Sequence, residues 1–179
     1  MNGKQNDKRT DKMELAEENF EKVYQLGMSY HKSCTGCAQC AVAALLEVLD
    51  MENDDVFKAA SGLSGGIGLS TNGSCGALTG GALVIGLLFG RDIDDFLSPL
   101  AAMTSYDLVK ELQDYFMAEF GSCCCADIQK KLVGRSFNLR DPEDAAAFVT
   151  HEIHDHCAKV VGKGTRKTLE IITEHWKRL

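Results

Sequence analysis

The chain has 179 residues, of which 45% are hydrophobic and 25% are charged, as in an ordinary globular protein. The formal net charge is −7 and no basic stripe with interleaved aromatic residues occurs, so nucleic acid is not expected as a partner. The N-terminal residues contain no apolar segment typical of a secretory signal. The longest nearly uncharged apolar run, Cys75–Phe89, is shorter than the ~20 residues of a spanning helix. We therefore expect a cytoplasmic protein without membrane insertion.

The first half of the chain reads as a polar tail followed by helices. Residues 1–12 are polar and charged, and we expect them to be a disordered tail preceding a single helical, cysteine-rich domain over residues 13–179. Apolar residues at helical spacing predict helices over Met13–His31 and Cys37–Leu49. Asn53 can cap a third, short helix that ends at Ala60.

A glycine-rich stretch, residues 61–76, follows the third helix and is predicted to be a loop. It leads into an apolar helix over Cys75–Phe89. Glycines are costly inside an exposed helix, whereas in a buried one they allow close packing against neighbouring helices. The sequence therefore predicts that this helix is buried at the centre of the fold and packs closely at Gly80, Gly81 and Gly86.

Three further helical segments are predicted in the second half. Thr104 or Ser105 can cap a helix that ends at Phe120, and Ser122 can cap the next, which ends near Val133. Asp141 with Pro142 is a favourable helix start, and the pattern then continues to Trp176, with a possible break near Gly162 and Gly164. No segment shows the alternation typical of a strand. The predicted fold is all-α, a compact bundle of about six to seven helices.

Eight cysteines in a chain without a secretory signal favour metal or redox chemistry over structural disulfides. Cys37, Cys75 and Cys125 fall at predicted helix starts, where free backbone N–H groups and the helix dipole favour the thiolate. A thiolate is the form that binds a metal or attacks a disulfide. The alternative for any single cysteine is a small buried hydrophobic residue.

Two weaker patterns lie elsewhere. Cys34, Cys37 and Cys40 have the spacing C-x2-C-x2-C, but Ala44 stands where a bacterial ferredoxin has its next cysteine. His154 precedes Cys157 by three residues, so both could reach one metal ion, although a solvated polar face near a helix end is the favoured explanation of the histidines. The consecutive cysteines at 123–125 diverge around a helix and cannot all serve one site.

The segments Cys37-Ala38-Gln39, Gly73 to Gly80 and Phe120 to Cys125, together with Cys157, resemble the redox-active family named for its C_GCAxxG_C_C cysteine pattern. The resemblance covers about residues 16–175 and implies an all-helical protein with a redox role. It selects four of the eight cysteines as the site: Cys37, Cys75, Cys125 and Cys157. A similar module occurs in split-Soret cytochromes, where cysteines hold an iron–sulfur centre. The haem-binding element of those proteins is absent here.

This resemblance favours an iron–sulfur cluster, or a related metal–thiolate centre, on those four cysteines, for electron transfer or redox sensing. Gly73, Gly76 and Gly80 would let the backbone approach the cluster and donate N–H groups to its sulfur atoms. Additional ligands could come from Cys34, Cys40 or His154. The expected partner is a redox protein of unspecified identity, and a homodimer is left open.

Two alternatives remain open from the sequence. One is a metal-free thiol–disulfide protein in which Cys75, exposed at a helix start, attacks and another cysteine resolves the mixed disulfide. The other is a structural zinc or partner-binding module without turnover. No reaction is specified by the sequence, so whether the protein is an enzyme is left undecided.

Overall fold

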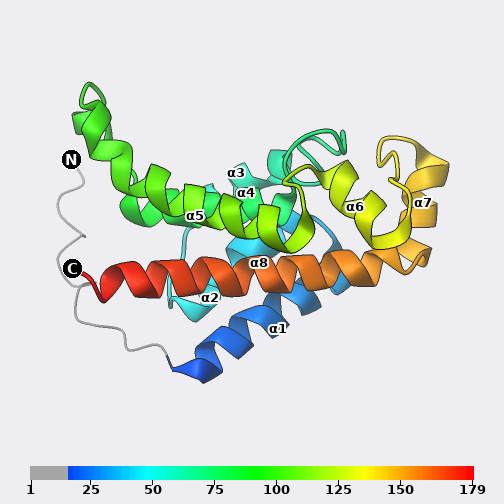
Figure 1. Ribbon diagram of the computed structural model, residues 1–179, viewed down its shortest axis with the longest axis horizontal. Coiled ribbons are helices and arrows are strands. Elements are labelled where there is room, and N and C mark those ends of the chain that lie inside the picture. Colours follow the sequence, from blue (N-terminus) through cyan, green and yellow to red (C-terminus); the bar gives the residue numbers. More distant parts are fainter. Residues whose placement is uncertain (1–15) are drawn as a thin grey trace.

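A computed structural model describes residues 16–179 of the chain, and this part is all-helical, which confirms the predicted fold class (Figure 1). The predicted tail and the first residues of the first predicted helix lie outside the described residues. Three short 3-10 turns, η1 (Ala60–Leu63), η2 (Ile93–Asp95) and η3 (Pro99–Ala102), connect the α-helices. The α-helices are α1 (Glu17–Cys34), α2 (Cys37–Val48), α3 (Asp54–Ala59), α4 (Gly76–Phe89), α5 (Met103–Phe120), α6 (Cys125–Val133), α7 (Pro142–Thr150) and α8 (Ile153–Trp176).

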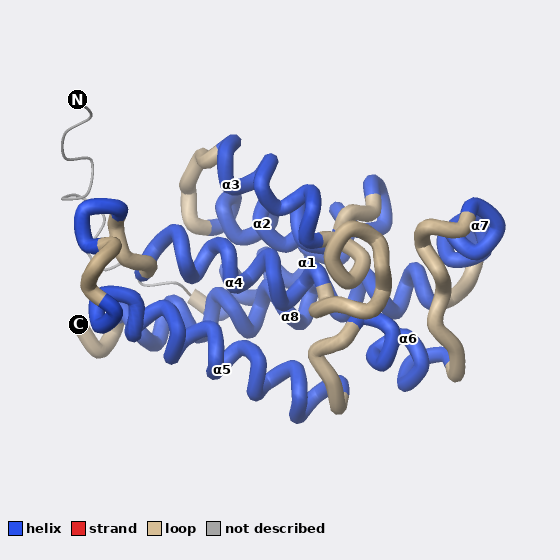
Figure 2. The backbone as a smooth tube through the Cα atoms, turned by 90° about the horizontal axis from the view of Figure 1, so that it is seen from above, coloured by secondary structure: helices blue, strands red, loops and turns tan. Residues whose placement is uncertain are grey.

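The longest helix, α8, is the axis around which the bundle is built. It packs against α1, α2, α4 and α5, and its N-terminal part contacts α6 and α7. In Figure 1 it runs across the whole molecule, with α5 along one side and α1 along the other. Seen from above in Figure 2, α6 and α7 lie together at one end, next to the long loops that precede α4 and α7. The long loops, and the starts of several helices, are therefore concentrated at the α6–α7 end of the molecule.

Helix α4 is buried, as its composition predicts, and two of its glycines are required by packing. A Cβ at Gly80 would lie 2.5 Å from the carbonyl oxygen of Ala38 in α2, and one at Gly81 would lie 2.4 Å from Oγ1 of Thr168 in α8. Gly86 has no neighbour within 4 Å of such a Cβ, so the prediction that it allows close packing is wrong. The close α2–α4 contact places the first turns of these two helices side by side.

The C-terminal helical pattern is divided in two, but not where the glycines suggested. The chain breaks between α7 and α8, at His151 and Glu152, while Gly162 and Gly164 lie inside α8. Gly162 packs against Tyr24 of α1, where an added Cβ would be 2.8 Å from the carbonyl oxygen. The glycines in this helix therefore serve tight helix packing and do not end it.

Helix α5 begins slightly earlier than expected. Ala102 is its N-cap, because the helix continues directly from η3, and Ser105 lies inside the helix with its hydroxyl donating to the Ala102 carbonyl at 2.9 Å. The cap predicted at Thr104 or Ser105 therefore lies two or three residues after the observed one.

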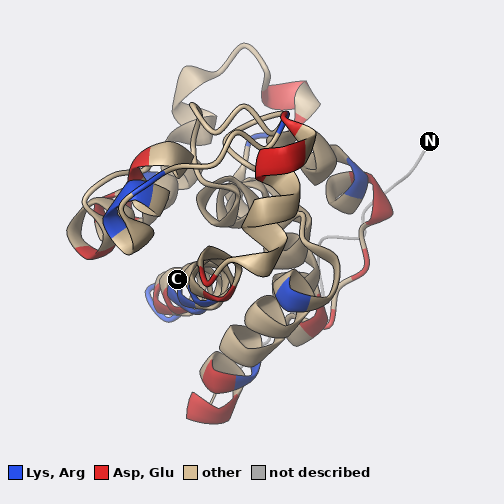
Figure 3. Ribbon diagram, turned by 90° about the vertical axis from the view of Figure 1, so that its right-hand side faces the viewer, with Lys and Arg blue, Asp and Glu red and all other residues tan. Residues whose placement is uncertain are grey.

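Most buried residues belong to one core among α1, α2, α4, α5 and α8. A second, smaller core is formed by Phe137, Phe148 and Ile153 under α7. Basic and acidic residues are interspersed over the outer helices, as Figure 3 shows, and many of them pair; Arg166, for example, contacts Glu17, Glu21 and Glu170. No helix within residues 16–179 combines the length and apolarity required to cross a membrane.

Candidate cysteine site

The structure brings the four cysteines selected by the sequence pattern to one cavity at the α6–α7 end of the molecule. Cys37 is the first residue of α2, Cys75 is the N-cap of α4, Cys125 is the first residue of α6, and Cys157 lies in the N-terminal part of α8. All four line a cavity of about 180 Å³. Residues distant in the sequence thus contribute four sulfur atoms to a single space.

Three of these cysteines stand at helix starts, as predicted, although one predicted cap differs. Cys75 is itself the N-cap of α4, and Cys124 rather than Ser122 is the N-cap of the helix that Cys125 begins. Because the first N–H groups of a helix have no intrahelical acceptor, three helix starts present positive dipole ends to the same cavity. This arrangement favours negative charge on sulfur.

The loops that carry Cys75 and Cys125 are tied together by backbone hydrogen bonds. Cys75 N–H donates to the carbonyl of Cys123 at 2.8 Å, and Cys125 N–H donates to the carbonyl of Gly73 at 2.9 Å. Ser74 and Cys124 form an isolated antiparallel bridge between the same segments. The relative position of the two sulfur-bearing residues is therefore set by the backbone.

Cys37 is held by the backbone of the glycine-rich loop and of the first residue of α4. The N–H of Gly65 donates to its Sγ at 3.3 Å, and a Cβ on Gly76 would lie only 2.1 Å from that Sγ. The predicted close backbone approach is thus found at Gly76. Gly73 instead packs on the Gly66 carbonyl, and Gly80 packs on α2. The N–H donor from Gly65 was not singled out from the sequence, because the glycine-rich loop offers no local signal for which amide meets a sulfur.

Burial opposes ionisation of these thiols when no cation is present. Burial, and repulsion from the neighbouring cysteines, raise the pKa of Cys75 well above its ordinary value and that of Cys125 to about 12. Burial is also the main cause of the raised pKa values of Cys37 and Cys157. Cys75 is only 8% exposed. The expectation of an exposed, readily ionised Cys75 is therefore wrong, because the helix start faces the protein interior.

The rest of the cavity wall is mostly apolar, and no Asp or Glu of residues 16–179 contributes to it. Apolar side chains come from the glycine-rich loop, from α6, from the α6–α7 connection, from α7 and from α8, namely Leu69, Ile128, Leu139, Phe148, Val149, Val160 and Val161. Such a wall excludes water and lowers the local dielectric constant, which strengthens any charge interaction inside.

A pair of neighbouring histidines, one buried and one half-buried, adjoins the cysteines. His31 is 3% exposed and lines the cavity, and its ring lies 5.1 Å from that of His154. Within the part of the chain that the structure describes, neither His31 Nδ1 nor His154 Nε2 has a hydrogen-bond partner. Burial lowers the pKa of His31 to about 4, and repulsion from His154 adds to the shift. His31 was missed from the sequence, although it continues the stripe of buried residues Val23 and Gly27 at intervals of four.

The remaining four cysteines do not line the cavity. Cys123 contacts the Gln113 carbonyl at 3.7 Å, and Cys124 contacts the Thr71 carbonyl at 3.6 Å. Cys34 and Cys40 lie beside each other, with their sulfur atoms 3.8 Å apart. The structure thus separates the eight cysteines into the four-cysteine cavity, one close pair and two single thiols.

In residues 16–179, no group of three or more His, Cys, Asp or Glu side chains is arranged to hold a metal ion. The cysteines of the cavity therefore share a space without forming a single-ion ligand set as they stand.

The fold and the site together define the class of protein: it is a helical protein in which four cysteines, far apart in the sequence, line one cavity. The sequence matches the family described as "Putative redox-active protein (C_GCAxxG_C_C)" over residues 35–171, most of the chain, and the chain belongs to this family. No curated protein and no solved structure shows a match to it.

Proposed function

We propose that the protein is a redox protein whose Cys37, Cys75, Cys125 and Cys157 hold an iron–sulfur cluster for electron transfer or redox sensing. The observation that carries this proposal is the convergence of these four cysteines, from four separate helices, on one buried cavity. The description of the family as redox-active also supports a redox function.

The donor set fits such a centre. Thiolates are the usual ligands of iron–sulfur clusters, whereas hard cations such as Mg²⁺ and Ca²⁺ require the carboxylates that this cavity lacks. Four neighbouring thiolates would repel one another without a compensating cation, and the raised pKa values of Cys75 and Cys125 express that cost. A bound metal removes the cost, because it stabilises the thiolate directly.

The size of the cavity favours a cluster over a single ion. At 180 Å³ it greatly exceeds the roughly 10–15 Å³ of equivalent volume that a single water occupies. The unpartnered Nδ1 of His31 supplies one further polar atom at this wall. A zinc site, with ligands about 2.3 Å from one ion, would need the sulfur atoms to move together.

When bound, a cluster would supply one-electron chemistry, and the chain's own residues would tune it. Gly65 N–H donates to Cys37 Sγ, and such donors stabilise the reduced, more negative state. The apolar wall excludes water and acts in the opposite direction, since it disfavours added charge. The reduction potential therefore depends on the balance between these donors and the wall.

The proposal is tested by purifying the protein anaerobically and measuring its visible spectrum with iron, acid-labile sulfide and zinc on one sample. We expect a brown protein with matching iron and sulfide. Cys75→Ser and Cys157→Ser should lose most of the iron, whereas Cys123→Ser, outside the cavity, should retain it. Zinc without iron would instead support a structural site. A protein that takes up neither metal, even after cluster reconstitution, would contradict the proposal.

A further inference from the structure

Outside the cavity, one pair of thiols is already in contact. Cys34 is the last residue of α1 and Cys40 lies in the first turns of α2, and their Sγ atoms are 3.8 Å apart. The two residues between the helices reverse the chain with left-handed backbone angles, φ 57° at Thr35 and 74° at Gly36. This tight turn places the two thiols on the same side of the α1–α2 junction.

We propose that Cys34 and Cys40 form a reversible dithiol–disulfide couple at the α1–α2 turn, distinct from the four-cysteine cavity. A disulfide requires a sulfur–sulfur distance of about 2.05 Å, so the sulfur atoms must approach by less than about 2 Å, which side-chain rotation can supply. Both thiols are held near backbone carbonyls in the reduced state: Cys40 Sγ lies 2.8 Å from the Thr35 oxygen and Cys34 Sγ lies 3.1 Å from the Tyr30 oxygen.

The two thiols differ in accessibility, which assigns their roles. Cys34 is exposed, whereas Cys40 is only 2% exposed. Burial, and the nearby Cys34, raise the pKa of Cys40, so its thiol is poorly suited to attack a partner from solution. Cys34 is therefore the entry thiol and Cys40 the resolving thiol. The other cysteines outside the cavity, Cys123 and Cys124, contact backbone carbonyls instead of a second sulfur.

The oxidant we infer is a disulfide, either glutathione disulfide or that of a redox protein. The Cys34 thiolate attacks one sulfur of this disulfide, forms a mixed disulfide and releases the first partner thiol. Cys40 then attacks Cys34 Sγ, forms the intramolecular disulfide and releases the second partner thiol, while its own proton passes to that thiolate. Two cysteine thiols lose two electrons and two protons, and the partner disulfide gains both.

The test exploits the spacing of cleavage sites. Trypsin cuts after Lys32 and Lys58, so one peptide, residues 33–58, contains Cys34, Cys37 and Cys40 and no other cysteine. The native full-length protein is equilibrated in glutathione buffers of increasing oxidation, and free thiols are blocked after denaturation in acid. We expect a peptide lighter by two hydrogens that carries a single blocking group, and fragmentation should place that group on Cys37.

Two variants make the assignment specific. Cys34→Ser replaces an exposed residue and should leave the fold intact while abolishing the oxidised peptide, whereas Cys123→Ser should leave it unchanged. Blocking groups on both Cys34 and Cys40 after equilibration in the most oxidising buffer would overturn the proposal, as would a bond that involves Cys37. The readout is independent of metal content, so its failure is distinguishable from failure of the proposed cluster.

Discussion

At the scale of single residues, the cavity depends on how closely the backbone can approach a sulfur atom. Cys37 Sγ receives the Gly65 N–H on one side and meets the Cα of Gly76 on another. The second contact exists only because residue 76 has no Cβ. Substitution at this position therefore tests the geometry of the site directly.

Gly76→Ala should displace Cys37 and weaken any bound centre. The added Cβ would lie 2.1 Å from Cys37 Sγ and 2.9 Å from the Ala38 nitrogen, so the start of α2 or of α4 must move. We expect a loss of stability of about 1–3 kcal/mol in urea unfolding, as for overpacking elsewhere, together with reduced iron content.

The matched control is Gly86→Ala in the same helix, where an added Cβ meets no atom within 4 Å. This change should be neutral or stabilising by up to about 1 kcal/mol, because alanine reduces the entropy of the unfolded chain. Equal effects of the two substitutions would show that crowding at Cys37 is unimportant.

A second residue-scale prediction concerns the buried His31. Because the folded state holds its pKa near 4 and an unfolded histidine titrates near 6.5, the unfolded chain takes up the proton first as the pH falls. The stability from a neutral His31 is therefore fully present above pH 6.5 and is lost as the pH falls toward 4, by about 3 kcal/mol in all.

His31→Phe removes this titration and should flatten the pH dependence of stability. The measurement is urea unfolding of metal-free wild-type and variant protein at pH 8, 6 and 5. The difference between the two proteins at pH 8 gives the cost of the substitution itself. A wild-type curve that falls no more steeply than that of the variant below pH 6.5 would refute the assignment of His31 as a buried neutral base.

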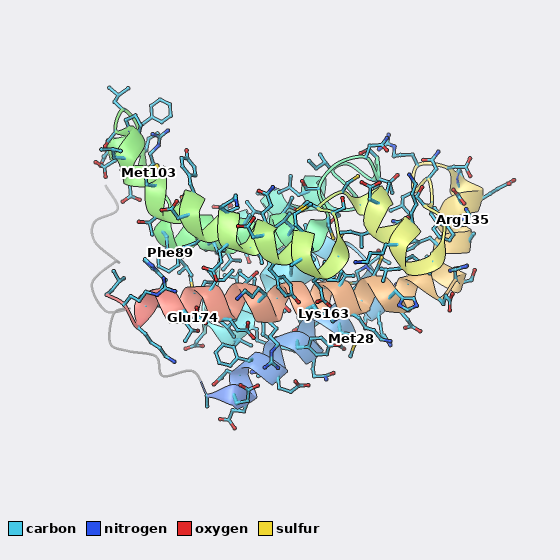
Figure 4. All side chains as sticks on the ribbon, viewed as in Figure 1. Met28, Phe89, Met103, Arg135, Lys163 and Glu174 are labelled. Carbon is cyan, nitrogen blue, oxygen red and sulfur yellow. The ribbon has the colours of Figure 1, made fainter. Side chains whose placement is uncertain are left out.

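At the scale of secondary-structure elements, α7 forms the outer wall of the cavity and depends on a few local contacts. Phe148 and Val149 of this helix line the cavity. Arg135, labelled at this end of the molecule in Figure 4, pairs with Asp144 and lies 4.1 Å from the centre of the Phe137 ring. The helix thus has a small core of its own, so its stability can be changed without disturbing the main bundle.

Asp141→Ala should loosen α7 selectively. The Asp141 carboxylate caps the helix by accepting hydrogen bonds from Glu143 N–H and Asp144 N–H, both at 3.0 Å. Loss of an N-cap costs about 1 kcal/mol. Hydrogen exchange of the α7 amides should become faster by about fivefold, while the amides in the middle of α8 should not change. Asp141→Asn, which keeps an acceptor oxygen, should stay close to wild type, and faster exchange throughout α8 would contradict a local effect.

The helices and the three helix-start cysteines of the cavity were predictable because their signals are local. Caps, Pro142 and glycine clusters mark helix ends within a few residues, so Cys37, Cys75 and Cys125 could be placed at such ends. The direction in which each helix start faces depends on tertiary packing. For this reason we predicted from the sequence that Cys75 is exposed, whereas in the structure it is buried.

Long-range packing also explains the other differences. Gly162 and Gly164 look like helix breakers in the sequence, but they are required by contacts with α1, α4 and α5 that only the folded bundle creates. The burial of His31 next to His154 joins α1 to α8 in the same way. The selection of four cysteines came from the family pattern, and no local feature distinguishes Cys157 from the cysteines outside the cavity.

At the scale of the whole molecule, the four cavity cysteines come from elements that are far apart in the sequence. Cys37, Cys75, Cys125 and Cys157 belong to α2, α4, α6 and α8, and α6 contacts the rest of the bundle mainly through α8. A centre bound by all four would cross-link these elements, and its binding energy would add to the folding energy.

Removal of the centre should therefore lower the thermal stability of the loaded protein. At a metal concentration about 1,000 times the dissociation constant, binding contributes about 4 kcal/mol, which corresponds to a fall in Tm of about 10 °C when the metal is withdrawn. The measurement is calorimetry of the anaerobically purified protein before and after chelation. Cys157→Ser, which lacks one ligand, should show a much smaller change, and Cys124→Ser should behave as wild type. A direct effect of the chelator on the protein would act on all three proteins alike, so an equal fall in Tm would contradict a role of Cys157 in binding the centre. A fall in Tm confined to wild type and Cys124→Ser would instead show that the stability of the bundle depends on a centre bound in the four-cysteine cavity.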